Sequence, residues 1–479
     1  MKKQIFNPYL PNYEYIPDGE PRVFEGRLYV YGSHDSFGSP FFCENDYVLW
    51  SAPVEDLSTW TYHGVIFRKD QDPLNRELLS VLFAPDAIQG IDGRYYLYYA
   101  PCEIGAIGVA VADRPEGPFE FLNHVGNERG LLGKRDDDPY PFDPAIFVED
   151  DKVYLYAGFD PDPSWDFIDR EFGCLKKPGA YVTELKQDMY TIRTEPVKLT
   201  INNVTDHGHD FFEASSIRKI KDKYYFIYSS WNSHELCYAM SDDPKGPFEY
   251  KGILHDNGDI GIVDEKHRVT YTGNNHGSIE EINGKYYIFA HRQTNYSTFA
   301  RQGIAERIYL KQDGTFDQAE LTSCGLNDGP LVMEGKYNAA IACHLTSKDG
   351  ALHYMDNCEG EGFENIRELH PAFTQDSKDE ERIETQYIRN MRDGSTAGFK
   401  YFTYKEEVKL QVTSRGDEGL FEVRTDLNGA ALATIPLSEN KDYKNSEPVI
   451  IRFPNKEKLS LYFTYRGKGS IDFLSFEFV

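Results

Sequence analysis

The sequence predicts an all-β protein, in which a five-bladed β-propeller is followed by a β-sandwich of the jelly-roll type. Two observations predict this fold: an aromatic strand motif recurs five times before residue 325, and short alternating strands fill the chain after residue 386. The composition agrees, because the 479 residues include 34 Tyr, 31 Phe, 39 Gly and 25 Pro. Aromatic residues favour pleated strands, and Gly and Pro favour the turns between them.

The recurring motif is a turn with Gly or Asp, then a basic residue, then a strand with alternating aromatic residues. Its copies are GRLYVYG, GRYYLYYA, DKVYLYAG, DKYYFIYSS and GKYYIFAHR, with equivalent tyrosines at Tyr29, Tyr96, Tyr154, Tyr225 and Tyr287. The steps between these tyrosines are 67, 58, 71 and 62 residues, which leaves room for four short strands and their loops. The repeats therefore predict a propeller domain over residues 1–325.

One polar residue opens a short apolar strand upstream of each repeated tyrosine. These residues are Asp18, Asp86, Asp143, Glu213 and His276. The first strand of each propeller blade lines the central channel, so we expect the five side chains to meet at one mouth of that channel. Any one of them alone could merely shape a turn. Four carboxylates around one axis repel each other, however, and such a group indicates a cation site or a reaction.

A set of carboxylates of this kind is suited to the hydrolysis of an acetal. One protonated carboxylic acid protonates the leaving oxygen, and one ionised carboxylate activates water on the opposite face. A third acidic neighbour raises the pKa of the acid. Carboxyls that face each other across a channel leave space for a sugar and a water, which favours an inverting mechanism. The spacing alone does not assign the acid and the base.

The charge and the cysteines exclude several classes of function. The formal net charge of -27 disfavours nucleic acid and anionic membranes as partners, and it permits a neutral sugar. The N-terminus has no apolar run behind its two lysines, and no stretch of about 18 apolar residues follows. The seven cysteines are scattered and never spaced as CxxC, which predicts neither a disulfide framework nor a zinc site. We therefore expect a soluble cytoplasmic protein.

Five segments, PDGEP, APDA, FDPAIF, FEASSI and NNHGSI, together resemble glycoside hydrolase family 43 over roughly residues 5–320. The resemblance implies an inverting hydrolase, with Asp18 as the general base and Glu213 as the general acid. It also implies that Asp143 modulates the pKa of the acid and orients it. The first motif departs from the family pattern by carrying a second carboxylate, Glu20, which would face the channel if the register were shifted by two residues.

The same resemblance implies a set of substrate-binding residues. Asp86 matches an acidic position near the substrate, and Arg292 and Arg301 match basic positions near the sugar pocket. Phe83 and Trp231 could offer apolar faces to a sugar ring. The alternatives are a core position for either aromatic residue and a surface salt bridge for either arginine.

The resemblance also implies a metal site. His276 lies where many members of the family hold a central calcium ion, often through water molecules. The alternative is a hydrogen-bonded structural histidine, because one imidazole is not a calcium site on its own. Calcium is thus the expected cofactor, and no organic cofactor is expected.

The last third of the chain changes character. Residues 326–385 read as a linker and inter-domain segment, which ends in the charged stretch DSKDEERIETQ. Residues 386–479 read as a β-sandwich that resembles a carbohydrate-binding module of family 6. All four tryptophans lie before this module, at Trp50, Trp60, Trp165 and Trp231. The missing tryptophan favours a structural or substrate-wall role over an independent sugar site.

The combined prediction is an exo-acting α-L-arabinofuranosidase that releases arabinose from arabino-xylooligosaccharides. The alternative is a β-xylosidase on xylooligosaccharides, since both activities use the same carboxylates. A more distant alternative is a non-catalytic propeller that binds sugars or proteins. The expected partner is a small oligosaccharide, without nucleic acid or membrane, and the sequence leaves the oligomeric state open.

Overall fold

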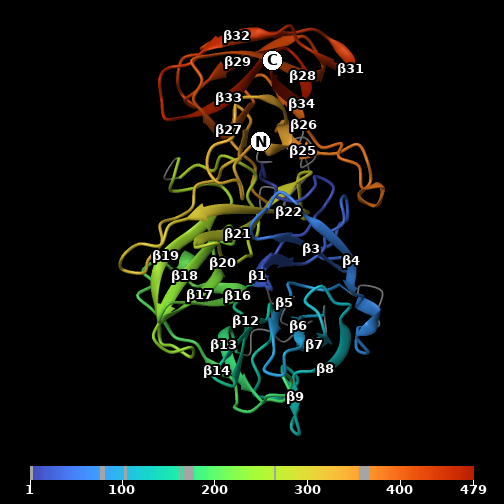
Figure 1. Ribbon diagram of the computed structural model, residues 1–479, viewed down its shortest axis with the longest axis vertical. Helices are drawn as coiled ribbons and strands as arrows, with labels where there is room; N and C mark the ends of the chain where they lie inside the picture. Colours follow the sequence, from blue (N-terminus) through green and yellow to red (C-terminus); the bar gives the residue numbers. More distant parts are fainter. Residues whose placement is uncertain are drawn as a thin grey trace.

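The computed structural model is all-β, which confirms the predicted class. In Figure 1 the sheets of the first two thirds of the chain form one part, and the strands from β25 onward form a second part above it. Among the described residues, no helix has the length and apolar character that a bilayer span requires. The structure describes residues 4–75, 81–101, 105–161, 164, 177–263, 266–354, 367 and 369–479.

Five sheets follow one another along the first part of the chain. The first holds β1 (Glu20–Phe24), β2 (Arg27–Tyr31), β3 (Tyr47–Pro53) and β4 (Thr61–Phe67), and the second holds β5 (Asp86–Gln89), β6 (Tyr95–Tyr99), β7 (Gly108–Ala112) and β8 (Glu120–His124). The third holds β11 (Ala145–Glu149), β12 (Lys152–Phe159), β13 (Gly179–Leu185) and β14 (Val197–Lys198).

The fourth sheet holds β16 (Phe211–Ile220), β17 (Lys223–Ser230), β18 (Glu235–Ser241) and β19 (Phe248–Asp256), with β15 (Ile201–Asn202) parallel to β19. The fifth holds β20 (Ile279–Ile282), β21 (Lys285–Thr294) and β22 (Ser297–Ile308). A separate ribbon joins β9 (Gly126–Asn127) to β10 (Gly130–Leu131). The described residues also form the 3-10 turns η1 (Lys69–Gln71), η3 (His207–His209), η4 (Ala339–Ile341) and η6 (Asp379–Glu381).

Each repeated tyrosine of the sequence lies in the second strand of one sheet, so the five repeats correspond to the five sheets. These second strands are largely buried on both faces, as β6 shows. Tyr95, Leu97 and Tyr99 pack toward the first sheet, whereas Tyr96 and Tyr98 pack toward the third. Side chains alternate in this way because successive residues of a strand point to opposite faces.

Contacts connect the first strands of neighbouring sheets. Strand β1 contacts both β5 and β20, β5 contacts β11, and β11 contacts β16. The hydroxyls of Ser216 and Ser278 lie 2.7 Å apart and join the fourth sheet to the start of the fifth. A hydrophobic cluster that includes Val30 and Phe289 fills the space between the first and fifth sheets. The residues that open the first strands are therefore brought close together.

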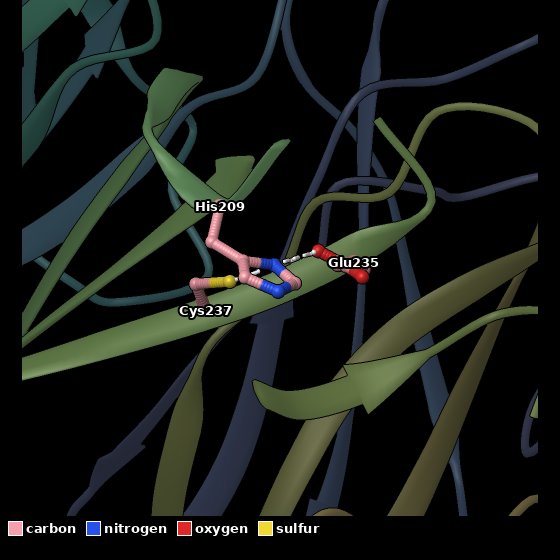
Figure 2. Close-up of side chains that lie close together, drawn as sticks. All are labelled: His209, Glu235 and Cys237. Atoms are coloured by element: carbon pink, nitrogen blue, oxygen red, sulfur yellow. Dashed lines mark hydrogen bonds and ion pairs between the residues drawn. The ribbon is translucent and has the colours of Figure 1, made fainter. Parts of the chain in front are cut away.

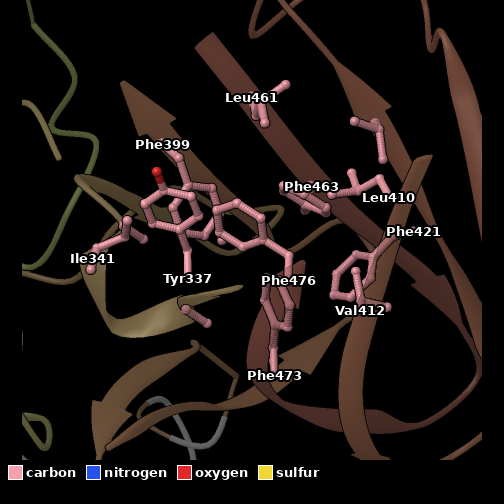
Figure 3. Close-up of a cluster of buried hydrophobic side chains, with 14 of the residues drawn as sticks. Tyr337, Ile341, Phe399, Leu410, Val412, Phe421, Leu461, Phe463, Phe473 and Phe476 are labelled. Carbon is pink, nitrogen blue, oxygen red and sulfur yellow. The ribbon is translucent and has the colours of Figure 1, made fainter. Parts of the chain in front are cut away.

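The second part is a sandwich of two sheets, as predicted. One sheet holds β25 (Ala372–Thr374), β26 (Tyr387–Arg392), β34 (Ser470–Phe478), β28 (Glu407–Gly416) and β31 (Asn440–Asn445), with β23 (Gly335–Asn338) and β32 (Val449–Arg452) at its edges. The other holds β24 (His344–Thr346), β27 (Thr396–Thr403), β33 (Lys458–Gly467), β29 (Gly419–Arg424) and β30 (Ala433–Leu437). Phenylalanines of both sheets interlock between them, among them Phe399, Phe421, Phe463, Phe473 and Phe476 (Figure 3).

The segment 326–385 differs from the predicted linker. It supplies β23, which pairs with β34, β24, which pairs with β27, and β25, which pairs with β26. The physical reason is that its apolar residues, such as Tyr337 and Phe373, complete the core of the sandwich. This segment is therefore part of the C-terminal domain.

A buried ion cluster joins the two parts of the molecule. Nζ of Lys400, in β27, lies 3.1 Å from Oδ2 of Asp259 and 2.9 Å from Oε1 of Glu320. Lys400 is 1% exposed and Asp259 is fully buried. Burial by itself raises the pKa of Asp259, but His344 and the charge of Lys400 outweigh it, and the pKa is lowered. The aspartate thus stays ionised against a cation that comes from the other domain.

Replacing Lys400 with Ala is expected to destabilise the folded chain by about 3–5 kcal/mol, because it leaves the Asp259 charge buried without its cation. The free energy of unfolding measured in urea checks this value. The matched control is Lys405→Ala in the same domain, which breaks a 3.0 Å pair between Lys405 and Glu334 that is half exposed to solvent. That control is expected to change the free energy by less than about 1 kcal/mol. Equal losses in both variants would contradict the role given to the buried cluster.

Candidate active site

The three predicted catalytic acids occupy equivalent places on three different sheets. Asp18 precedes β1 by two residues, Asp143 precedes β11 by two residues, and Glu213 lies near the start of β16. Their backbone is unusual at each place. Asp18 and Asp143 have φ of 56° and 45°, and Ala214, next to Glu213, has φ of 64° within a bulge of β16. Left-handed backbone and bulges cost energy and re-aim side chains, and they concentrate at functional sites.

Asp18 is an ionised carboxylate in a buried place. Its Oδ1 accepts a hydrogen bond of 2.9 Å from Nη1 of Arg301 and lies 3.3 Å from Nδ1 of His291. The residue is 4% exposed. Burial acts to raise the pKa of Asp18, but the charge of Arg301 and the His291 ring outweigh it and hold the pKa well below its usual range. Asp18 can therefore accept a proton but does not hold one at neutral pH.

Arg301 is positioned by a second carboxylate that the sequence did not reveal. Nε of Arg301 donates to Oδ2 of Asp35 at 2.8 Å, and Nη2 donates to Oδ1 at 3.0 Å. Asp35 is fully buried, and the guanidinium also lies 4.7 Å from the ring centre of Phe42. The segment SHDSFG around Asp35 carries no repeat or motif, so only the fold brings it to Arg301. Arg301, which the sequence analysis assigned to substrate binding, thus lies in the site and donates a hydrogen bond to Asp18.

Replacing Asp35 with Asn is expected to lower kcat/KM about 10- to 100-fold, because a charge-assisted bond to Arg301 contributes about 1.5–3 kcal/mol. With Arg301 loosened, the pKa of Asp18 rises, so the acid limb of the pH profile moves to higher pH. Steady-state kinetics across pH check both effects. The matched control is Asp46→Asn, which removes a carboxylate that accepts from the backbone N of Lys69 in the same region. An unmoved acid limb in Asp35→Asn would contradict the positioning role.

Asp143 contacts the segment that carries Glu213. Its Oδ2 accepts a hydrogen bond of 3.1 Å from the backbone N of Ala214 and lies 3.6 Å from Nδ1 of His276. Burial raises the pKa of Asp143 to about 8, and the charges of Glu213 and Asp18 add to this while His276 opposes it. The bond to Ala214 ties Asp143 to the bulge that carries Glu213, which suits a residue that orients the acid.

Glu213 is a protonated carboxylic acid under neutral conditions. Burial raises the pKa of Glu213 to about 8, and the charge of Asp18 contributes while Arg301 opposes it. Within the described part of the chain, no hydrogen bond of its carboxyl is found. Its proton is therefore free to be given to a bound molecule. The site thus holds one ionised carboxylate, Asp18, and a pair of carboxyl groups, Asp143 and Glu213, that retains a proton. Acid–base hydrolysis of an acetal requires this combination.

Asp86 corrects a sequence prediction. It is fully buried and accepts three hydrogen bonds from Arg22, from Nε to Oδ1 at 3.0 Å and from Nη2 to Oδ1 at 2.9 Å and to Oδ2 at 2.6 Å. The backbone N of Ile146 donates to Oδ2 at 2.8 Å. With its oxygens occupied and no exposed surface, Asp86 joins the first strands of neighbouring sheets instead of binding substrate.

Glu20 is also engaged elsewhere. Its Oε2 lies 2.8 Å from Nη2 of Arg218, and the residue is 1% exposed. Burial raises the pKa of Glu20, and the charged groups that also act on it are Arg218, Asp86 and Arg22. Asp18, in contrast, raises the pKa of both Asp143 and Glu213. Glu20 is thus engaged by Arg218, whereas Asp18 is close enough to Asp143 and Glu213 to raise the pKa of both.

Arg292 corrects a second prediction. Its Nη1 donates to the backbone carbonyl of Ala340 at 2.7 Å, and its guanidinium lies 4.0 Å from the ring centre of Phe373. Both partners belong to the sandwich, and Arg292 is 7% exposed. It therefore anchors the C-terminal domain and does not reach a substrate.

Each of the two predicted aromatic residues contacts a ring that lies close in sequence to one of the acids. The ring of Phe83 is 5.1 Å from that of Phe142, which directly precedes Asp143. Trp231 follows β17, its ring lies 4.3 Å from that of His207, and its backbone N donates to the carbonyl of Asp210. Its buried indole Nε1 has no hydrogen-bond partner among the described residues.

Comparisons with known proteins agree with this geometry. The model of the glycosyl hydrolases family 43 matches residues 20–316. A xylosidase/arabinosidase of Thermoclostridium stercorarium is 46% identical over 99% of both chains. A xylosidase/arabinosidase 43A of Humicola insolens is 32% identical, covering 58% of this chain and 88% of that protein.

Solved structures extend the comparison. The β-xylosidase/α-arabinofuranosidase CoXyl43 from a compost metagenome, in complex with xylotriose and in a calcium-free form, has a TM-score of 0.53 at 28% identity, covering 66% of this chain and 98% of that chain. A Bacillus subtilis arabinoxylan arabinofuranohydrolase of family 43 has a TM-score of 0.50 at 19% identity, covering 99% of this chain and 97% of that chain. The second likeness concerns the fold alone, and it includes both domains.

Proposed function

Because this chain belongs to glycosyl hydrolase family 43, we propose that it is an exo-acting, inverting hydrolase that releases single pentose units from short arabino-xylooligosaccharides. The observation that carries the proposal is the division of charge among the three acids. Asp18 is held ionised by Arg301, whereas burial keeps a proton on the pair formed by Asp143 and Glu213. Two carboxyl groups with opposite protonation are the requirement for this reaction.

We propose a role for each acid in a single step. Glu213 gives its proton to the glycosidic oxygen as the bond from that oxygen to the anomeric carbon breaks. Asp18 takes a proton from the water whose oxygen forms the new bond at that carbon. Asp143 is the proposed modulator and orienting residue of the acid, because its bond to the backbone N of Ala214 holds the bulge that carries Glu213. Afterwards Asp18 carries a proton and Glu213 does not, and exchange with solvent restores the starting state.

We also propose that the five sheets are the blades of a five-bladed β-propeller, the fold expected of the family. The contacts among the first strands support this arrangement, and it places the three acids at one mouth of the central channel. The C-terminal domain would then be the family 6-like module of the sequence prediction. Its contacts with Arg292 and Asp259 of the first part support a structural role for that module.

Of the two pentoses, we propose α-L-arabinofuranosides as the preferred substrates. A β-xyloside preference is the second candidate, and a specific observation favours it, since the CoXyl43 relative was solved with xylotriose and a Xanthomonas citri relative with xylose. Phe83 and Trp231 are proposed to contact the sugar. The same three acids serve both substrates.

Assays with 4-nitrophenyl α-L-arabinofuranoside, 4-nitrophenyl β-D-xyloside and arabino-xylooligosaccharides test the proposal. Wild-type protein is expected to release nitrophenol and single pentoses, and the faster glycoside names the preferred sugar. Asp18→Asn is the inactive variant, and Glu281→Gln, an exposed acid on the fifth sheet, is the matched control that stays active. Failure of wild-type protein on all three substrates would overturn the proposal.

We also propose that a calcium ion binds at His276, the position where the family resemblance implies a calcium site. Calcium prefers oxygen ligands. The residues fit, because the side-chain oxygen of Asn275, next to His276, is buried and has no hydrogen-bond partner among the described residues. His276, through water, and Asn275 would hold the ion, whose charge would add positive potential beside the acids.

Calcium is therefore expected to raise the midpoint of thermal unfolding of chelator-treated wild-type protein, because a ligand that binds only the folded chain stabilises it. The rise is expected to be lost in His276→Ala. His63→Ala on the first sheet is the control that keeps it. A calcium-dependent rise of equal size in His276→Ala would contradict the placement of the ion.

A further inference from the structure

Three side chains, two from the fourth sheet and one from the turn η3 before it, converge at one place (Figure 2). They are His209, Glu235 and Cys237, and one ligand atom of each lies within 4.8 Å of the others. Nδ1 of His209 is 2.8 Å from Oε2 of Glu235, and Sγ of Cys237 is 3.9 Å from the same oxygen. An imidazole nitrogen, a carboxylate oxygen and a sulfur thus face one small volume.

The fold explains why these three side chains meet. Glu235 and Cys237 are the first and third residues of β18, so they point to the same face of the sheet. His209 ends η3, and its carbonyl accepts a hydrogen bond of 2.9 Å from the hydroxyl of Tyr228. Two elements separated by a full β-hairpin therefore contribute to one cluster.

The carboxylate of the cluster is held in place by its own neighbours. The hydroxyl of Ser230 donates to Oε2 of Glu235 at 2.8 Å, and Nδ2 of Asn232 donates to it at 3.2 Å. Within the described part of the chain, the thiol of Cys237 is fully buried and makes long contacts of 3.9 Å to Glu235 and to the hydroxyl of Tyr250. Its sulfur thus lies beside the nitrogen and the oxygen of the cluster.

We propose that His209, Glu235 and Cys237 form a binding site for zinc, or for a divalent transition metal of similar preference. Zinc binds imidazole nitrogen, carboxylate oxygen and thiolate sulfur at four-coordinate sites. A sulfur ligand selects such metals against calcium and magnesium, which take oxygen ligands. The side chain of His209 is 22% exposed, which gives an ion and a water ligand access from solvent.

Binding requires a rearrangement of protons but no oxidant or reductant. The Cys237 thiol releases its proton to solvent and binds as thiolate, and His209 binds through Nδ1 as the neutral ring. The direct contact between His209 and Glu235 is replaced by bonds from both residues to the ion. A neighbouring group formed by His234, Asp256 and the same Glu235 lacks a sulfur, so it does not compete for a thiophilic metal.

The position of the cluster indicates what the metal does. It links η3 to β18, and η3 is followed by β16, which carries Glu213. The ion would therefore fix the segment that leads to the acid while staying outside the chemistry. We expect it to stabilise the fourth sheet and to leave hydrolysis possible without it.

Cobalt binding to the full-length, chelator-treated protein tests the site. Co²⁺ bound to a thiolate absorbs in the near ultraviolet, and this band is expected to saturate at about one cobalt per chain and to vanish when Zn²⁺ is added. Cys237→Ser is expected to lack the band. Cys324→Ser, which changes another free thiol, is the matched control and keeps it. Addition of Zn²⁺ is expected to raise the unfolding midpoint of wild type and not of Cys237→Ser.

His209→Gln keeps the test decisive if Cys237→Ser folds poorly. This partly exposed position tolerates substitution, and the variant is expected to bind cobalt at least about tenfold more weakly. A wild-type protein without the band, or a band that persists in Cys237→Ser, would overturn the proposal. The readout is independent of hydrolysis, so its result does not depend on the proposed function.

Discussion

Replacing Glu213 with Gln is expected to lower kcat on arabino-xylooligosaccharides by about 10²–10⁴, the usual contribution of a general acid. The sugar leaving group is a poor one and needs the proton that Glu213 holds. Nitrophenolate leaves without much protonation, so the loss on 4-nitrophenyl glycosides is expected to be much smaller. Steady-state kinetics on both kinds of substrate measure the difference. The matched control is Glu281→Gln, which leaves both rates unchanged.

The pH profile provides a second measure of the same role. Burial raises the pKa of Glu213 to about 8, so wild-type kcat/KM is expected to fall as the pH rises through about 8 and the acid loses its proton. Asp18 is ionised already at low pH, because Arg301 holds its pKa down, so the plateau extends into the acid range. The alkaline limb is expected to disappear in Glu213→Gln. A loss independent of the leaving group, with an unchanged alkaline limb, would contradict the assignment.

Replacing Asp18 with Asn is expected to lower kcat by about 10²–10⁴ on every substrate, whatever its leaving group. The amide cannot take a proton from the attacking water, and this step is needed for sugars and nitrophenol alike. Arg301 keeps its two bonds to Asp35, so the fold is expected to survive.

The contrast between the two variants is the informative result. Asp18→Asn is expected to lose activity on oligosaccharides and on 4-nitrophenyl glycosides equally. Glu213→Gln is expected to keep much more of its activity on the 4-nitrophenyl glycosides. Circular dichroism and the unfolding midpoint of each variant check that the chain is folded. Activity of Asp18→Asn within tenfold of wild type on oligosaccharides would show that another group activates the water.

The periodic features of the chain could be predicted from the sequence, because they are repeated. The five aromatic strands became the second strands of five sheets, and their phase located Asp18, Asp143 and Glu213. The phase could not separate these acids from Asp86, which opens a first strand in the same way. What distinguishes Asp86 is Arg22, which lies 64 residues earlier in the chain and is brought to it only by the fold.

Features that depend on distant pairing were not predictable for the same reason. Strand β23 has four residues and β24 has three, which is too short for a readable alternation, and β23 pairs with β34 at the far end of the chain. Asp35 and Arg301 are likewise far apart in sequence. The cysteine pattern gave no sign of a zinc site, because His209, Glu235 and Cys237 meet across a hairpin and not within a CxxC motif.

The stereochemistry of hydrolysis tests the central claim most directly, namely that Asp18 activates water opposite to the proton of Glu213. Proton NMR during hydrolysis of 4-nitrophenyl β-D-xyloside by the full-length protein shows which anomer of xylose forms first. The account predicts α-xylose first, with β-xylose appearing later by mutarotation. β-Xylose as the first product would contradict it, because the anomeric centre would then have been retained through a covalent intermediate.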